Sequence, residues 1–234
     1  MATEQGPAVC TSRSRIILIG FVLLLFISLT ACGTAPVRTL NAPDGSATCT
    51  VYTSADGSVS KLKISSGETP VTVLHPRSSV CDNGSGVEFA DINFDGLYDI
   101  RLPIRTGRNT YYASYICGDN GYYSVPTLDA LPSPTVNVLA QTISSPYSSY
   151  TVEPATDDFP EVYISEAGTN IYVWRHGQLT LSARDSFTYY SENDIYCVAH
   201  WQVNDSGILE AVSERWLTPG QYAALTDTPE LPVG

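Results

Sequence analysis

The sequence predicts an all-β fold, and three observations support this prediction. Between residues 47 and 217 the chain consists of short segments rich in β-branched and aromatic residues. Gly, Asn, Asp and Pro separate these segments at the short spacing that is typical of β-sandwiches and β-propellers. Helical periodicity is clear only at 219–225 and weaker at 126–131. We therefore expect one antiparallel all-β domain.

The N-terminal half of this domain contains two clear hairpin signals. Asp56-Gly57 is a strong signal for a tight turn between two strands. The Gly-containing triplet 119–121 has the same role between two tyrosine-rich strands. The strands expected in this half are 48–53, 59–64, 71–75, 87–89, 98–102, 110–117 and 122–125.

The C-terminal half of the domain is predicted to contain further strands separated by turns. Turns are expected at Ala167-Gly168, at His176-Gly177 and at 204–207, because each of these contains a Gly between apolar runs. The strands expected in this half are 161–165, 170–175, 179–183, 194–203 and 208–213.

The N-terminal segment has the features of an export signal that ends at a lipidated cysteine. Arg13 and Arg15 precede an apolar run at 16–29, which is shorter than the about 20 residues of a membrane-spanning helix. Residues 29–32, Leu-Thr-Ala-Cys, resemble the bacterial lipobox, whose cysteine receives acyl chains such as palmitate. We expect cleavage before Cys32 and anchoring through these chains. Gly33 in place of Asp favours the outer membrane, by resemblance to sorted lipoproteins.

This cleavage defines four segments of the chain. They are the signal peptide at 1–31, the lipidated cysteine with a flexible tether at 32–46, the all-β domain at 47–217 and a C-terminal tail at 218–234. Removing the signal peptide leaves 12 − 2 = 10 basic and 24 − 1 = 23 acidic residues, a net charge of −13. Because such a surface repels nucleic acid and anionic lipid headgroups, we expect no nucleic-acid partner and attraction for a cationic one.

Four cysteines remain in the mature domain besides Cys32. An even number in an oxidising compartment predicts two disulfides, and four cysteines allow three connectivities. The sequence has no Cys-x-x-Cys pair and its three histidines lie far apart, which argues against a zinc site. The four are Cys49, Cys81, Cys117 and Cys197.

An acidic loop at 91–99 has the ligand spacing of a calcium loop. Oxygen side chains stand at its positions 1, 3, 5 and 9, and Gly96 at position 6 permits a sharp turn. Three carboxylates this close repel one another unless a cation lies between them. Position 12 is Leu102 rather than the Glu of an EF-hand, and the flanking residues alternate as strands do. The alternative is an Asx-rich turn that binds no metal. The expected ligands are Asp91, Asn93, Asp95, the carbonyl of Leu97, and Asp99.

The same residues carry a family resemblance. Segment 89–100 (Phe-Ala-Asp-Ile-Asn-Phe-Asp-Gly-Leu-Tyr-Asp-Ile) resembles the signature of β-propeller immunity proteins, which inhibit peptidoglycan hydrolases delivered by type IV secretion. Segments 128–134, 141–145 and 172–181 are similar to further family features in the same order. The resemblance spans 87–184 and implies a propeller-like domain that binds Ca²⁺ and a periplasmic peptidoglycan hydrolase.

A ring of blades also suggests a disulfide pairing. Its two chain ends meet, so the expected bridge between the first strand and one of the last is Cys49–Cys197. Cys81 and Cys117 flank the acidic loop, so the second expected bridge is Cys81–Cys117.

The tyrosine-rich hairpin is the candidate partner-binding surface. Tyrosine rings give a large contact area at little entropic cost. The alternative is that these rings pack in the core and reach water through their hydroxyl groups. The candidates are Tyr111, Tyr112, Tyr122 and Tyr123.

No motif of an enzyme is present. The sequence contains no Gly-x-Ser-x-Gly, no His-Glu-x-x-His and no phosphate-binding loop, so we expect a protein without catalysis. The sequence therefore predicts a lipid-anchored inhibitor of a peptidoglycan-degrading toxin. Two alternatives stay open: a structural or assembly lipoprotein of the outer membrane, and a glycan-binding module that uses its aromatic side chains.

Overall fold

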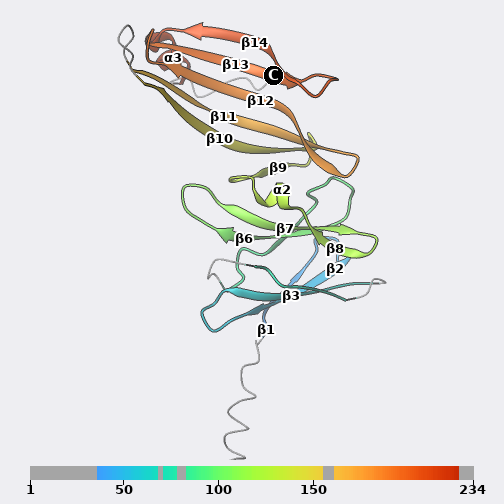
Figure 1. Cartoon of the computed structure of the whole chain (residues 1–234). Coiled ribbons are helices and arrows are strands. Elements are labelled where there is room, and N and C mark those ends of the chain that lie inside the picture. Colours follow the sequence, from blue (N-terminus) through green and yellow to red (C-terminus); the bar gives the residue numbers. More distant parts are fainter. Residues whose placement is uncertain (1–35, 68–70, 78–82, 155–160, 227–234) are drawn as a thin grey trace, which may run out of the picture. The chain divides into compact units, whose positions relative to one another are not determined.

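The computed structural model of this chain describes residues 36–67, 71–77, 83–154 and 161–226. All of these belong to one of two compact units, the one that begins at Pro36. The predicted signal peptide, Cys32 and Cys81 lie outside the described residues. The described chain forms three antiparallel sheets and two short helices (Figure 1).

The first sheet contains the hairpin predicted around Asp56-Gly57. The Asp56 Oδ1 accepts a 3.0 Å hydrogen bond from the backbone N–H of Ser58, and Gly57 adopts φ +83°, so the turn is formed as predicted. The first strand was expected to be part of the flexible tether, but it pairs along the next strand through its backbone. The strands, in sheet order, are β1 (Pro36–Asn41), β2 (Ala47–Thr53), β3 (Val59–Ser66) and β4 (Thr72–Leu74).

The second sheet holds the acidic loop and the tyrosine-rich hairpin. The loop joins its first two strands, and the predicted turn after Gly118 joins its last two. A short helix, α2 (Pro126–Asp129), follows and begins at a Pro, whose fixed φ suits the first helical position. The strands, in sheet order, are β5 (Glu88–Ala90), β6 (Asp99–Arg105), β7 (Tyr111–Gly118) and β8 (Gly121–Ser124).

The third sheet is the largest, and its order is β14-β13-β12-β11-β10-β9. The predicted turn at His176-Gly177 is confirmed, with φ +51° and +73° at its two residues. A helix, α3 (Pro219–Thr226), follows the last strand within the range assigned to a tail, where the helical periodicity at 219–225 predicts it. The strands are β9 (Thr135–Asn137), β10 (Thr142–Glu153), β11 (Val162–Arg175), β12 (Gln178–Tyr190), β13 (Ile195–Val203) and β14 (Leu209–Leu217).

The turn predicted at Ala167-Gly168 is wrong, because β11 runs through both residues without a break. Ala167 pairs with Phe187 and Gly168 with Ser186 on β12. A Cβ at Gly168 would lie 2.0 Å from the backbone oxygen of Asp185. The glycine therefore permits a close approach of two strands rather than a reversal of the chain.

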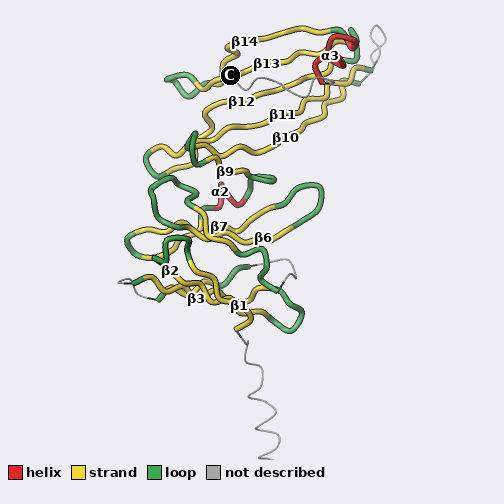
Figure 2. The backbone as a smooth tube through the Cα atoms, turned by 180° about the vertical axis from the view of Figure 1, so that it is seen from behind, coloured by secondary structure: helices red, strands yellow, loops and turns green. Residues whose placement is uncertain are grey.

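Two hydrophobic clusters hold the sheets together. Figure 2 traces the backbone of the described strands, loops and helices. The first joins the first and second sheets, with Leu62 and Ile100 among its fully buried side chains. The second joins the second sheet and α2 to the third sheet, through Ile116, Leu128 and Ile143. Across this second cluster the Trp174 indole donates a 2.8 Å hydrogen bond to the backbone oxygen of Ile92.

The all-β prediction is confirmed, whereas the propeller is not. The described sheets have four, four and six strands, and none of them closes into a barrel or a ring of blades. In this described part of the chain we also find no helix with the length and apolar character needed to span a membrane.

Candidate functional site

Side-chain oxygens of the acidic loop accept hydrogen bonds from backbone N–H groups of the same loop and so shape its turn. Phe94 at φ +63° and Gly96 at φ +85° reverse the chain between β5 and β6. The Asn93 Oδ1 accepts from the N–H of Asp95 at 3.2 Å, and the Asp95 Oδ1 accepts from the N–H of Leu97 at 2.8 Å. These Asx turns follow from the sequence alone, since each acceptor serves an amide two residues later.

Asp99, the last predicted calcium ligand, has another role in the structure. Its side chain is 0% exposed. Its Oδ2 accepts from the N–H groups of Ile92 at 2.7 Å and Asn93 at 3.3 Å, and its Oδ1 accepts from the N–H of Cys117 at 2.7 Å. Burial raises the pKa of Asp99 to about 7, although these amides partly oppose the shift. The carboxylate thus fastens both ends of the loop to β7.

The remaining predicted ligands form a smaller oxygen set. The Asp91 Oδ2 accepts from the N–H of Gly96 at 3.1 Å, while its Oδ1 is buried and has no hydrogen-bond partner. Within the described chain no three Asp, Glu, His or Cys side chains gather in a group that could hold a metal ion. A cation here would therefore need a mixed set. It would consist of Asp91, Asn93, Asp95 and the Leu97 carbonyl, a combination of carboxylate and neutral oxygens that suits Ca²⁺.

The four candidate tyrosines do not form one common surface. Tyr122 packs against the first core cluster and donates a 2.9 Å hydrogen bond to the backbone oxygen of Tyr98, so its main role is in the core. The guanidinium carbon of Arg105 lies 3.9 Å from the ring centre of Tyr111, and that of Arg101 lies 4.8 Å from that of Tyr112. Tyr123 is 49% exposed. Arginine side chains therefore lie against two of the four rings, and their positive charge is unfavourable for a cationic partner.

The thiols of Cys49, Cys117 and Cys197 are free. Cys49 lies in β2 within the first core cluster, where burial raises the pKa of its thiol to about 12. Cys197 lies in β13 of the third sheet. The predicted Cys49–Cys197 bridge is therefore not formed, since the pairing assumed a closed ring and the sheets are open. Of the other predicted bridge, Cys117 has a free thiol and Cys81 lies outside the described residues.

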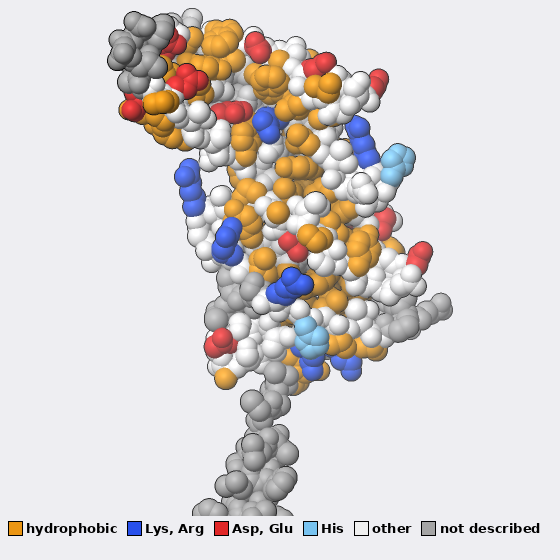
Figure 3. Space-filling model, in the orientation of Figure 1, with side chains coloured by type: hydrophobic (Ala, Val, Ile, Leu, Met, Phe, Trp, Pro, Cys, Tyr) orange, Lys and Arg blue, Asp and Glu red, His pale blue; other side chains and the backbone are white. Residues whose placement is uncertain are grey.

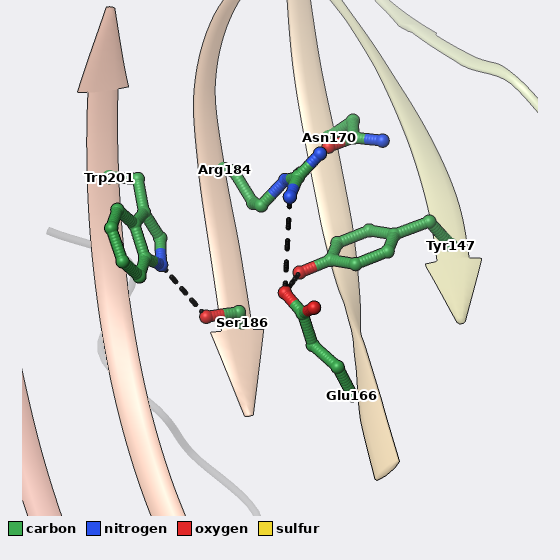
Figure 4. A network of polar contacts seen from close by, with 6 residues as sticks. All are labelled: Tyr147, Glu166, Asn170, Arg184, Ser186 and Trp201. Atoms are coloured by element: carbon green, nitrogen blue, oxygen red, sulfur yellow. Dashed lines mark hydrogen bonds and ion pairs between the residues drawn. The ribbon is translucent and has the colours of Figure 1, made fainter. Parts of the chain in front are cut away.

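A polar network on one face of the third sheet was not anticipated from the sequence (Figure 4). The Tyr147 hydroxyl donates a 2.6 Å hydrogen bond to the Glu166 Oε1, and the Arg184 Nη1 lies 3.9 Å from the same oxygen. The Arg184 Nε donates to the Asn170 Oδ1 at 2.8 Å, and the Trp201 indole donates to the Ser186 hydroxyl at 2.9 Å.

The chemistry of this network is limited by its single carboxylate. Burial, followed by the bond to Glu166, raises the pKa of Tyr147, so its hydroxyl stays protonated and acts as a donor. Glycoside hydrolysis in most families uses a pair of carboxylates, and this group has only Glu166. The six residues come from four strands. Where one strand supplies two of them, they lie an even number of positions apart and so share a face. Only the strand register could have revealed them in advance.

Comparisons with known proteins show no family for this chain. No protein-family model and no curated protein matches the chain. Among solved structures the chain is similar to a Xanthomonas protein described as related to a type IV secretion system. The two are 14% identical, the likeness covers 77% of this chain and 98% of that one, and the TM-score is 0.48. A likeness at this level carries no argument about function.

Proposed function

We propose that this protein is a lipid-anchored component of the bacterial cell envelope that inhibits a peptidoglycan-degrading hydrolase, as an immunity protein inhibits a toxin. Acylated Cys32 would hold it at the outer membrane, facing the periplasm. The observation that carries the proposal is segment 89–100, which resembles the signature of such immunity proteins. In the fold this segment is a strand, a turn and a second strand, spanning β5 to the start of β6.

The proposal includes a calcium ion in the acidic loop. The buried and unpartnered Asp91 Oδ1 supports it, because an ionised oxygen without a partner is costly away from water. Asp91, Asn93, Asp95 and the Leu97 carbonyl would hold the ion, and Asp99 would fix the loop beneath it. A bound cation would neutralise the repulsion between the carboxylates and stiffen the turn.

The mode of inhibition that we propose is occlusion by a rigid surface. A pre-formed sheet loses little conformational entropy when it binds, so contact area is converted to affinity with little loss. The described sheets share two hydrophobic clusters and extensive backbone pairing, which supports such rigidity. The net charge of −13 would accelerate docking on a cationic hydrolase.

The test uses the mature chain without its lipid, produced from residue 33 onward with Cys32 omitted. The candidate target is any peptidoglycan hydrolase encoded beside this chain, because an immunity protein is normally encoded beside its toxin. Its activity is assayed on purified peptidoglycan. We expect stoichiometric loss of hydrolase activity and no lysis of peptidoglycan by the chain alone. A hydrolase that works at full rate with a tenfold molar excess of the chain would remove the proposal, and a structural lipoprotein would take its place.

A second candidate function, glycan binding, is favoured by the network of Figure 4. Planar polar side chains beside aromatic rings can bond sugar hydroxyls while the rings stack on the sugar. Here the Arg184 guanidinium carbon lies 4.5 Å from the ring centre of Tyr147, and Arg184 bonds Asn170 and pairs across strands with Trp201. Calorimetric titration with soluble peptidoglycan fragments tests this alternative, and Trp201→Ala should abolish any heat of binding that it predicts.

A further inference from the structure

A row of aromatic side chains crosses one face of the third sheet. Residues that pair directly across strands share a face, and so do residues two positions apart on one strand. Tyr150 of β10 pairs with Ser165 of β11, which pairs with Tyr189 of β12, which pairs with Tyr196 of β13. We call this the tyrosine row. By the same rule it also contains Tyr163 and Phe187, beside Ser165 and Tyr189.

The rings of the tyrosine row touch one another and are open to solvent. Tyr150 stacks on Tyr163 with 6.0 Å between ring centres, and Tyr189 lies 4.9 Å from Tyr196. Helix α3 extends the row, because Tyr222 stacks on Tyr196 at 4.2 Å. Tyr150 is 62% exposed, Tyr163 39% and Phe187 40%. Rings that pack against each other are held in place, and rigid exposed rings are the usual anchors of protein interfaces.

Acidic groups surround the tyrosine row. The Tyr189 hydroxyl donates a 3.1 Å hydrogen bond to the Asp194 Oδ1. Glu161 accepts from the Tyr163 hydroxyl, and this bond raises the pKa of that phenol. Asp185, two residues before Phe187 on the same face, has a side chain that is 59% exposed and is paired with His200. The basic side chain of this face on β14 is Arg215, whose partner on β13 is Val198.

The negative charge of the chain is concentrated in the third sheet. The described residues of this sheet and its connections, 135–154 and 161–226, contain 9 acidic and 3 basic side chains, a net charge of 3 − 9 = −6. Acidic side chains lie among hydrophobic ones over this sheet (Figure 3). By contrast, Arg101 and Arg105 lie on Tyr112 and Tyr111 of the second sheet. Aromatic surface and negative charge therefore coincide on the third sheet and not on the tyrosine-rich hairpin.

We infer that the tyrosine row is the docking surface for the hydrolase, and that the face it binds is cationic. This inference rests on the proposed function and names the surface that performs it. The acidic groups around the tyrosine row attract and orient a cationic face during the encounter, and the rings of the row then provide the buried contact. A second copy of this chain is a poor occupant, because two sheets of charge −6 repel each other.

The test measures binding of the hydrolase to the mature chain by surface plasmon resonance, with a matched control. The double variant Tyr150→Ala/Tyr163→Ala removes two exposed, stacked rings of the row. Tyr123→Ala removes a ring of similar exposure, 49%, on β8 of the second sheet. We expect the double variant to bind at least about tenfold more weakly, mainly through faster dissociation, and the control to bind within about twofold of wild type.

A variant that changes only charge separates the contribution of the acidic groups around the row from that of its rings. Asp194→Asn, which keeps the shape of the side chain, should slow association and weaken its dependence on salt while dissociation stays unchanged. Circular dichroism of every variant establishes that the sheets are intact. If wild type binds and the double variant binds equally well, or the control loses affinity instead, the tyrosine row is not the docking surface. If the wild-type chain does not bind the hydrolase, that result contradicts the proposed function and also this inference, which rests on it.

Discussion

The Asp99 Oδ1 accepts a 2.7 Å hydrogen bond from the backbone N–H of Cys117, which joins the base of the acidic loop to the next strand of its sheet. The other oxygen of Asp99 accepts from two amides at the start of the loop. One buried carboxylate thus satisfies three backbone donors that would otherwise lack partners. These three bonds fix the base of the acidic loop.

The first prediction is that Asp99→Asn destabilises the domain. The amide has the shape of the carboxylate but turns one of its acceptors into a donor, which would then face a backbone N–H. Leaving buried donors without an acceptor costs about 1–3 kcal/mol. Urea unfolding should show a loss of this size, whereas Asp119→Asn, at an exposed turn, should change stability by less than about 0.5 kcal/mol.

The second prediction is a stability that falls with rising pH through this group. The pKa of Asp99 is raised to about 7 in the folded chain, above its unfolded value of 3.8. The folded state therefore holds the proton more tightly, and this contribution is complete below pH 3.8 and lost as pH rises through 7. Unfolding free energies measured from pH 4 to pH 8 in chelator should decline for wild type relative to Asp99→Asn. Parallel curves for the two would contradict the assignment.

The third prediction concerns calcium. A ligand that binds only the folded state stabilises it, and a Kd of about 10⁻⁴–10⁻³ M gives about 1.4–2.7 kcal/mol in 10 mM Ca²⁺. Differential scanning fluorimetry should show a higher Tm with Ca²⁺ and a return with chelator. Asp91→Asn/Asp95→Asn should abolish the response. A wild-type Tm indifferent to 10 mM Ca²⁺ would reduce the loop to a turn.

The fourth prediction is that Gly168→Ala strongly destabilises the third sheet. The added Cβ would lie 2.0 Å from the Asp185 backbone oxygen, so β11 and β12 must separate locally. We expect a loss of at least about 2 kcal/mol by urea unfolding. Gly107→Ala is the control, because no atom lies within 4 Å of its added Cβ and its φ is not positive. Equal stability of the two variants would show that β11 and β12 are not so close.

The fifth prediction concerns the anchor. Cys32→Ser should give an unprocessed precursor that incorporates no labelled palmitate, because the serine cannot form the thioether that precedes cleavage. Labelling of wild type in the same cells is the control. Label retained in the variant would remove both the lipidation site and the proposed location.

The hairpins were predictable because their signals are local. Asp56 bonds an amide two residues away and Gly57 supplies the positive φ, so the turn is encoded within four residues. The acidic loop is equally local in its Asx turns. Its seat on β7 was not predictable, since the Cys117 amide lies 18 residues away.

The long strands of the third sheet were harder to predict. Gly168 indicated a turn, but its reason is the backbone of a neighbouring strand. β10 was not among the expected strands, and it contains Pro146, which is tolerated because β9 pairs only with residues Thr142 to Ser144. The tyrosine row likewise depends on register across four strands. The residue pattern along one strand indicates that a tyrosine favours a β-strand. Only its pairing with the neighbouring strands shows on which face of the sheet its side chain lies.

The most direct test of the proposed function is whether the mature chain inhibits a peptidoglycan hydrolase encoded beside it, in the presence of Ca²⁺. Hydrolysis of purified peptidoglycan is followed against increasing inhibitor at fixed enzyme. The proposed function predicts a titration that ends near one inhibitor per enzyme, and a shallower one for Tyr150→Ala/Tyr163→Ala. Full hydrolase activity at every ratio of folded wild-type chain would contradict it.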